Sequence, residues 1–495
     1  MNKIIACFFY FANVWVINAQ VHLGPGQAYA NIEVAFKSNA IKPGDTVYLH
    51  AGSYSGYQYI TNLHGAQNKW ITIRPFGTDQ IDISGTWQFA SCSYLRFEYL
   101  NFKGNSKNPG RLFSIDNGGS CLTQSKHIVV RHCIFSNVTD PNAIAAFKFG
   151  GVDSFEVSNN IFKDFPAISA MDYNVCHAGV IIENRIENCL TGGHIKGGAS
   201  DITMERNFFI NASQDSWVAF ELGGDTGAQF YCPNENYEVK NLNFYSNIVV
   251  GGYRGLALSS AVNCNVINNT FYNCGQATMR FLTTSVLFPA LSGNRVENNI
   301  FAFGNSAYFN GGKQPTGAAS FSNNIYCSII NPVFNGPYWD TPDLDLIKDK
   351  NPTLFGSNTV IFQDGKNNNF NLVQGSPAIG KGTMIKEPKY DFYGKLFSPT
   401  SRSIGAIEFN IATADHDVLD EQHNRSIKIF PNPAKNDITI EAKEIPKQIE
   451  IFNSVGVRLL ISDYHSRILI DQYLPGIYFL KVGKEVLQFV VLNRN

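Results

Sequence analysis

One Asn-centred pattern recurs along the middle of this chain and constrains its fold more than any other feature. The Asn residues lie at positions 160, 184, 207, 247, 269, 299 and 324, each with an apolar residue three positions earlier and another two positions later. Successive members are 24, 23, 40, 22, 30 and 25 residues apart, so the unit is about two dozen residues long with two insertions. A period in this range is typical of a solenoid, in which each repeat stacks on the previous one.

The repeat predicts three short strands in each coil. In the segment 193–211, the expected strands are His194–Lys196, Ile202–Glu205 and Phe208–Ile210, with Asn207 at a corner. Strands this short cannot bury a face alone, but they can pair in parallel with the neighbouring coils at about 4.8 Å. The Asn amides then stack and satisfy backbone groups at the corners. We therefore expect an all-β chain built on a right-handed parallel β-helix.

The two ends of the chain predict further segments. Residues 1–20 carry a short apolar core and are typical of a secretory signal peptide. Residues 28–40 place apolar side chains at helical spacing, which predicts a helical cap over the first coil. The β-helix is then expected over residues 21–409, and the polar, acidic stretch 410–426 is expected to be a linker.

The coils resemble those of secreted bacterial right-handed β-helix repeat proteins, which include polysaccharide lyases. The resemblance rests on repeat segments such as His194–Ile202 and Asn263–Phe271, and on the closing segments Gly375–Gly380 and Ser403–Glu408. It implies the fold of residues 21–409. Glycoside hydrolases, epimerases and other proteins share this fold, so the resemblance does not decide the activity.

A second resemblance covers residues 427–495. The Pro-Asn-Pro motif in Ile427–Pro433 and the Gly-Ile-Tyr strand in Pro475–Val482 resemble the C-terminal sorting domain of the type IX secretion system of Bacteroidetes. That domain is a small β-sandwich, and the resemblance implies that residues 427–495 bind the secretion machinery. We expect a protein that is secreted or attached to the cell surface.

Charge and cysteine content limit which ligands and which covalent or metal cross-links the chain is expected to have. Lys+Arg 39 and Asp+Glu 40 leave a formal net charge of −1, so no basic field for nucleic acid is expected. Cys7 lies in the signal segment, and the other nine cysteines cannot all pair within one chain. Because Cys133, Cys189 and Cys274 follow the repeat register, we expect core residues rather than disulfides or a metal cluster. The chain is expected to act as a monomer.

The first strand of each coil predicts a column of outward polar side chains, since residues alternate in and out along a strand. The column comprises Ser114, Asp116, Lys148, His194, Lys196, Trp217, Glu221, Thr278 and Arg280, with Arg254 beside Gly255 in a direction that the register does not fix. The insertion at 223–236 is expected to form a wall beside this face. Such a groove suits a linear polymer, although a charged column can also be a merely solvated face.

These residue types fit a lyase acting on an acidic polysaccharide by β-elimination. Lys196 is the candidate base, and Arg280 is a candidate for neutralising the carboxylate charge that grows during proton removal. His194 and Glu221 are the other candidate catalytic residues. The substrate is therefore expected to be an extracellular, uronate-containing chain.

Further side chains of the column are candidates for substrate binding. They are Lys148 for a uronate, Trp217 for stacking on a sugar ring, Asp116 and Arg254. No cofactor is required by this scheme. Calcium, which is common in lyases of this fold, stays open because the scattered Asp201, Asp215, Glu221 and Asp225 do not follow the spacing of a calcium loop.

Two other functions compete with the lyase hypothesis. A glycoside hydrolase needs two carboxylates flanking the scissile bond, for which Glu221 with Asp225 or Asp215 are available. A non-catalytic surface protein that binds glycan or mediates adhesion needs no such pair.

Overall fold

The structure is a computed structural model that divides into two compact units, residues 1–409 and 410–495. It describes residues 20–77, 79–104, 111–140, 142–143, 145–211, 218–310, 317–339, 349, 351–409, 427–430, 434, 437–442, 448–453, 458–470, 473, 476–483 and 485–491. The expected linker and, except for Gln20, the expected signal peptide lie outside these residues. Among the described residues, none of the helices has the length and apolar character to cross a membrane.

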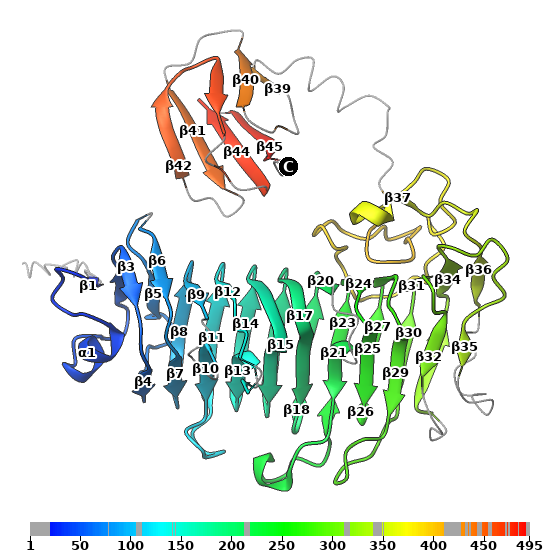
Figure 1. Cartoon of the computed structure of the whole chain (residues 1–495), viewed down its shortest axis with the longest axis horizontal. Helices are drawn as coiled ribbons and strands as arrows, with labels where there is room; N and C mark the ends of the chain where they lie inside the picture. Colours follow the sequence, from blue (N-terminus) through cyan, green and yellow to red (C-terminus); the bar gives the residue numbers. More distant parts are fainter. Residues whose placement is uncertain are drawn as a thin grey trace, which may run out of the picture. The chain divides into compact units, whose positions relative to one another are not determined.

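The first unit is a parallel β-helix of about 12 coils, which confirms the predicted solenoid (Figure 1). Face 1 consists of β1 (Gln20–Leu23), β2 (Thr46–Leu49), β5 (Ile71–Pro75), β8 (Ser93–Glu98), β11 (Ser125–Arg131), β14 (Val152–Ser158), β16 (His177–Ile182), β19 (Thr203–Glu205), β23 (Asn243–Tyr245), β27 (Asn265–Ile267), β30 (Asn294–Glu297) and β33 (Ala319–Ser322). The short strands β18 (Ala199–Ser200), β22 (Val239–Lys240) and β26 (Ala261–Val262) extend it at one edge.

Two more ladders of parallel strands complete each coil. Face 2 consists of β3 (Gly52–Tyr54), β6 (Ile81–Ile83), β9 (Asn101–Lys103), β12 (Ile134–Ser136), the first parts of β15 (Ile161–Asn174) and β17 (Arg185–Lys196), β20 (Phe208–Asn211), β24 (Ile248–Gly251), β28 (Thr270–Tyr272), β31 (Ile300–Phe303), β34 (Ile325–Ser328) and β36 (Thr353–Phe355). Face 3 consists of β4 (Gln58–Thr61), β7 (Trp87–Ala90), β10 (Phe113–Asp116), β13 (Ala145–Gly150), the second parts of β15 and β17, β21 (Val218–Gly223), β25 (Arg254–Ser259), β29 (Ala277–Leu282), β32 (Tyr308–Asn310) and β35 (Tyr338–Trp339). Because β15 and β17 run through both faces, these coils have two strands where the sequence predicts three.

The repeated Asn residues form a buried ladder along one corner, and the predicted stacking is confirmed. Oδ1 of Asn207 accepts hydrogen bonds from the backbone N and Nδ2 of Asn184, at 2.9 and 3.0 Å. Its own Nδ2 donates to the carbonyl of Ile181 at 2.9 Å and to Oδ1 of Asn247 at 3.0 Å. Each repeat thus satisfies backbone groups of the coil before it, as buried polar groups require.

A carboxylate ends the Asn ladder. Oδ2 of Asp349 accepts hydrogen bonds from the backbone N and Nδ2 of Asn324, at 3.0 and 2.7 Å. Oδ1 of Asp349 accepts from the backbone N of Asn323 at 2.7 Å. An ionised carboxylate is only an acceptor, so it closes the row without leaving an amide donor unpaired.

Apolar side chains fill the interior in columns that follow the coils. The rings of Phe102, Phe135 and Phe162 stack in sequence with centroids 5.0 and 4.9 Å apart, close to the spacing between coils. All three side chains are fully buried. This interior fixes which residues of each strand must point outward.

A helix covers the first coil of the β-helix, and a later segment packs on one of its faces. Helix α1 (Ile32–Lys37) buries Ile32 and Ala35, and the side chain of Asn31 accepts a hydrogen bond from Val34 N at its start. The helical cap predicted within 28–40 is therefore confirmed, although it is shorter. Near the other end, residues 361–409, with the hairpin of β37 (Phe362–Asp364) and β38 (Asn369–Leu372), pack on face 2 through an apolar cluster.

The second unit has the predicted β-sandwich character. One antiparallel sheet contains β39 (Ile427–Phe430), β40 (Asp437–Ala442) and β43 (Arg467–Leu469). The other contains β41 (Gln448–Asn453), β42 (Arg458–Asp463), β44 (Gly476–Val482) and β45 (Glu485–Val491). Buried side chains from both sheets form one apolar core.

Candidate functional site

A row of side chains, most of them charged, crosses face 3, one from each successive coil. Strand pairing aligns Lys148 of β13 with Asp172 of β15, then with His194 of β17 and Glu221 of β21. The row continues through Ala257 to Arg280 of β29. Neighbouring members are one coil apart, about 4.8 Å, so their charges interact directly.

Part of this row forms the floor of a cavity of about 400 Å³. The polar floor residues are Asp116, Lys148, Asp172, Asn174, His194 and Lys196. One wall consists of Asp225, Thr226, Gly227 and Phe230, from the insertion between β21 and β22. The sequence predicted this wall, and the structure confirms it.

Asp172 is the centre of the polar floor. Its side chain is almost completely buried, and Oδ2 accepts a hydrogen bond from Nζ of Lys148 at 2.6 Å. Its Oδ1 accepts from Nδ2 of Asn174 at 2.7 Å. Nε2 of His194 lies 2.8 Å from the same oxygen, with its N–H off the line of a regular hydrogen bond. Three neighbours from three coils thus surround one carboxylate.

These neighbours keep Asp172 ionised. Burial alone would raise the pKa of its carboxyl, but contact with His194 and then with Lys148 outweighs that cost and holds the pKa well below its ordinary value. A buried carboxylate beside an imidazole fixes the orientation of the ring. The other ring nitrogen of His194, Nδ1, has no hydrogen bond within the described part of the chain.

Lys196 differs from Lys148 in its pairing. It follows His194 by two positions on β17 and lines the same cavity. Across the described ranges, its ammonium group makes neither a hydrogen bond nor an ion pair. A half-buried ammonium without a protein partner is free to bind an anionic group.

The other candidates from the sequence lie apart from this cluster. Glu221 accepts a hydrogen bond from Oγ of Ser259, and Arg280 is further along the row. Arg254 aligns with inward-facing neighbours, and its Nε donates to Oε1 of Gln276 at 3.0 Å, outside the cavity. Trp217 lies outside the described residues.

Two predicted outward side chains are covered. Ser114 and Thr278 have outward positions in the register but are only 1 % and 2 % exposed. The prediction that they belong to an accessible column is therefore wrong, because an outward position in the register does not by itself expose a short side chain.

The wall is fastened by a disulfide that the sequence did not predict. Cys121, which follows β10, bonds to Cys232 of the insertion. The expectation of core cysteines is confirmed for the seven free ones, which are all buried, and is wrong for this pair. Glu238 at the end of the insertion is also buried, and it accepts hydrogen bonds from Gly197 N, Thr226 and Tyr231.

His177 links the insertion to face 1. Nδ1 of its ring lies 2.8 Å from Oδ1 of Asp153, and Nε2 lies 3.1 Å from Oε1 of Glu235. Burial lowers its pKa, but the two carboxylates outweigh burial and raise the pKa from 6.5 to about 10. His177 is therefore a cation between two anions at neutral pH.

The His177 contacts predict a pH-dependent contribution to stability. Because its folded-state pKa is raised, the contribution is complete below the unfolded value of about 6.5 and is lost as the pH rises through about 10. We expect His177→Asn to lower the midpoint of thermal unfolding most at about pH 6, with the difference from wild type shrinking towards pH 10. Calorimetry across this range measures the difference, and a constant difference would contradict the assignment.

The described residues do not fit a calcium site. They contain no group of three or more His, Cys, Asp or Glu side chains that could hold a metal ion. Asp172 is already surrounded by donors, and Asp201 accepts from Ser200 and Asn241. Asp116 accepts from Gln88 and Gly118, so none of these carboxylates presents the oxygen cluster that calcium needs.

Sequence reasoning missed several members of the cavity, of which Asp172 and Phe230 matter most for its chemistry. Asp172 lies in Met171–Asn174, where apolar and polar residues alternate in the same way as in Ile195–Lys196. Phe230 is an aromatic side chain on the wall and is 61 % exposed. Its position in the predicted insertion was the available signal.

Comparison with protein families identifies the C-terminal unit. Residues 428–491 match the family model of the secretion system C-terminal sorting domain. The chain ends in a secretion sorting domain. Such a domain marks proteins exported by type IX secretion, so the protein is secreted or held at the cell surface, and the secretion machinery is its partner. The localisation predicted from the sequence is confirmed.

Solved structures similar to the chain include two polysaccharide lyases and a protein in complex with a sugar. The pectate lyase Pel9A has 13% identity and a TM-score of 0.44, with 79% of this chain and 97% of that chain covered. XylC in complex with xylose has 10% identity and a TM-score of 0.45, with 79% of this chain and 98% of that chain covered. The PL6 family alginate lyase AlyGC has 14% identity and a TM-score of 0.36, with 67% of this chain and 53% of that chain covered. The chain thus spans about half of that enzyme. A search of curated proteins found no match.

Proposed function

We propose that this secreted protein is a carbohydrate-active enzyme that cleaves an acidic polysaccharide by β-elimination. The observation that carries the proposal is Lys196, an ammonium group with no partner among the described residues that borders a cavity next to the Asp172 and His194 pair. A uronate carboxylate is the anion that an extracellular polymer would offer to it. The wall beside the floor supports a site for one stretch of a linear chain.

The proposed reaction removes the proton on C5 of a uronate. The C4–O4 bond breaks, its electron pair leaves with O4, which takes a proton from water, and a C4=C5 double bond forms. Negative charge grows on the uronate carboxylate during proton removal, so a cation beside it stabilises the transition state. Lys196 supplies this cation, and His194, oriented by Asp172, takes the proton at Nδ1.

This division of roles differs from the sequence-based hypothesis, in which Lys196 is the base. Lys148, which with Arg280 was a candidate for neutralising a uronate there, is already bound to Asp172 at 2.6 Å. Its charge is therefore offset within the protein, which favours Lys196 for the substrate carboxylate. Glu221 and Arg280, one and three coils beyond His194, are proposed to contact neighbouring sugar residues.

Phe230 is proposed to take the stacking role that the sequence assigned to Trp217. Its exposed ring borders the cavity from the insertion that forms the wall. Aromatic rings bind the apolar faces of sugars while leaving the sugar hydroxyls hydrated. The site then holds a ring between an apolar wall and a charged floor.

A panel of soluble polyuronates tests the proposal. The purified full chain is incubated with polymers of mannuronate, guluronate and galacturonate, and with neutral polysaccharides. We expect absorbance from the unsaturated product with at least one polyuronate. New reducing ends without this absorbance would instead indicate a hydrolase, and binding without any product would indicate an adhesive protein; either result would overturn the lyase assignment.

A further inference from the structure

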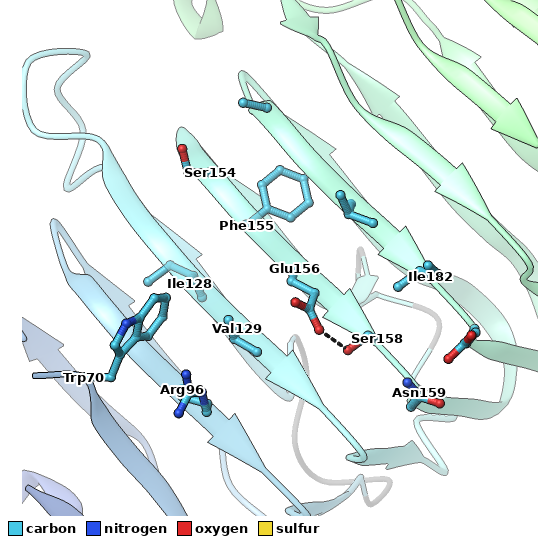
Figure 2. A pocket seen from close by; sticks show the side chains of 13 residues that line it. Trp70, Arg96, Ile128, Val129, Ser154, Phe155, Glu156, Ser158, Asn159 and Ile182 are labelled. Carbon is cyan, nitrogen blue, oxygen red and sulfur yellow. Dashed lines mark hydrogen bonds between the residues drawn. The ribbon is translucent and has the colours of Figure 1, made fainter. Parts of the chain in front are cut away.

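We infer that face 1 carries a second carbohydrate-binding site, separate from the cavity on face 3, that takes a neutral glycan. A groove of about 640 Å³ lies on the outer side of face 1. Its lining includes Trp70, Arg96, Val129 and Glu156, which Figure 2 labels, and also Val180 and Glu183. None of these residues lines the face 3 cavity.

The floor of this groove is a straight row of outward side chains. Strand pairing aligns Arg96 of β8 with Val129 of β11, then with Glu156 of β14 and Val180 of β16. Three coil steps of about 4.8 Å give a row about 14 Å long. An extended chain of β-linked sugar rings advances, per ring, by about the distance between two coils. Each ring can therefore contact one coil.

One end of the groove presents an aromatic ring and a cation. The guanidinium carbon of Arg96 lies 5.0 Å from the centre of the Trp70 ring. Nε of Arg96 is buried without a hydrogen bond, since the nearest carboxylate oxygen, Oε1 of Glu98, is 3.7 Å away. The Arg96 side chain as a whole is 31 % exposed and lines the groove, so its guanidinium is available to donate to a sugar hydroxyl.

The middle and far end present acceptors over an apolar floor. Oε1 of Glu156 accepts from Oγ of Ser158 at 2.6 Å (Figure 2), and Glu183 lines the groove one coil further along. The apolar side chain of Val180 is 38 % exposed and is therefore available to pack against a ligand. Apolar patches of this kind pack against the C–H faces of sugar rings.

The charges select the class of glycan. Of the two carboxylates in the lining, Glu183 is paired with Arg206 at 2.9 Å, whereas Glu156 makes no ion pair within the described ranges and would repel a uronate. The same carboxylates accept hydrogen bonds from neutral hydroxyls without that penalty. The occupant that fits this groove is therefore an uncharged polysaccharide.

Titration calorimetry of the full chain with a soluble β-glucan, a xylan and a galactomannan tests this inference. We expect binding of at least one of them, with affinity reduced about tenfold or more in Trp70→Ala and in Glu156→Ala. Tyr393→Ala, an exposed aromatic outside the groove, is the matched control and is expected to bind as wild type does.

The outcomes separate this site from the proposed active site. Lys196→Ala is expected to leave binding of the neutral polymer unchanged. Absence of binding to all three polymers, wild-type affinity in Trp70→Ala, or loss in Trp70→Ala of affinity for a polyuronate instead would each overturn the inference. Circular dichroism of each variant checks that the β-helix is intact.

Discussion

Replacing Lys196 with Ala is expected to lower kcat/KM on the cleaved polyuronate by about 100- to 1000-fold while leaving the fold unchanged. Lys196 borders the cavity without a polar partner in the described structure, so its removal breaks no hydrogen bond or ion pair there. The substitution does remove the positive charge that stabilises the negative charge growing on the substrate carboxylate. Initial rates of double-bond absorbance against substrate concentration measure the loss.

Controls distinguish this loss from a general loss of positive charge. Lys126 on β11 is exposed on face 1, and Lys126→Ala is expected to retain full activity. His194→Ala is expected to be as inactive as Lys196→Ala, because the base is missing. Full activity in Lys196→Ala would contradict the proposed role of its charge.

Replacing Asn207 with Ala is expected to destabilise the β-helix by about 4 kcal/mol. The change leaves the backbone N–H and one amide donor of Asn184, and the carbonyl of Ile181, without their partners. Each buried polar group left unpaired costs about 1–3 kcal/mol. Urea unfolding followed by circular dichroism measures the free energy of unfolding.

The matched control for Asn207 lies on the surface. Asn101 makes a single hydrogen bond at 3.2 Å from its Nδ2 to Asp82, and Asn101→Ala is expected to change stability by less than about 0.5 kcal/mol. Equal effects of the two substitutions would show that the buried ladder contributes no more than an ordinary surface amide.

The repeat and its faces could be predicted because their physical causes are local. Each coil must bury its apolar side chains and satisfy its corner, so Asn207 and its neighbours mark the register in the sequence itself. The same register brought Lys148, His194 and Glu221 to one face. The sorting domain was predicted for a similar reason, since its motifs lie within short segments.

Asp172 escaped prediction because the distance from the Asn corner to face 3 is not constant. His194 follows Asn184 by ten residues, whereas Asp172 follows Asn160 by twelve. The pairing of β15 with β17 is irregular between Phe165 and Ser169, where the extra residues are absorbed. Counting from the corner therefore places the wrong residues opposite His194.

The disulfide escaped prediction because its proximity is not local. Cys121 and Cys232 are 111 residues apart, and they meet only because the long insertion runs back along the coils. No repeat register constrains the path of an insertion. The path of the insertion depends on tertiary contacts, such as that of His177 on β16 with Glu235 in the insertion. The sequence around either residue alone does not predict this contact.

Asp349 at the end of the Asn ladder has a consequence for self-association. In the Asn ladder, each side chain accepts hydrogen bonds from the coil before it and donates one to the coil after it. An open end would accept a second molecule as its next coil, and the product would be a growing fibre. The Asp349 carboxylate accepts hydrogen bonds from the backbone N and Nδ2 of Asn324 and has no side-chain donor of its own, so we expect it to disfavour such end-to-end association.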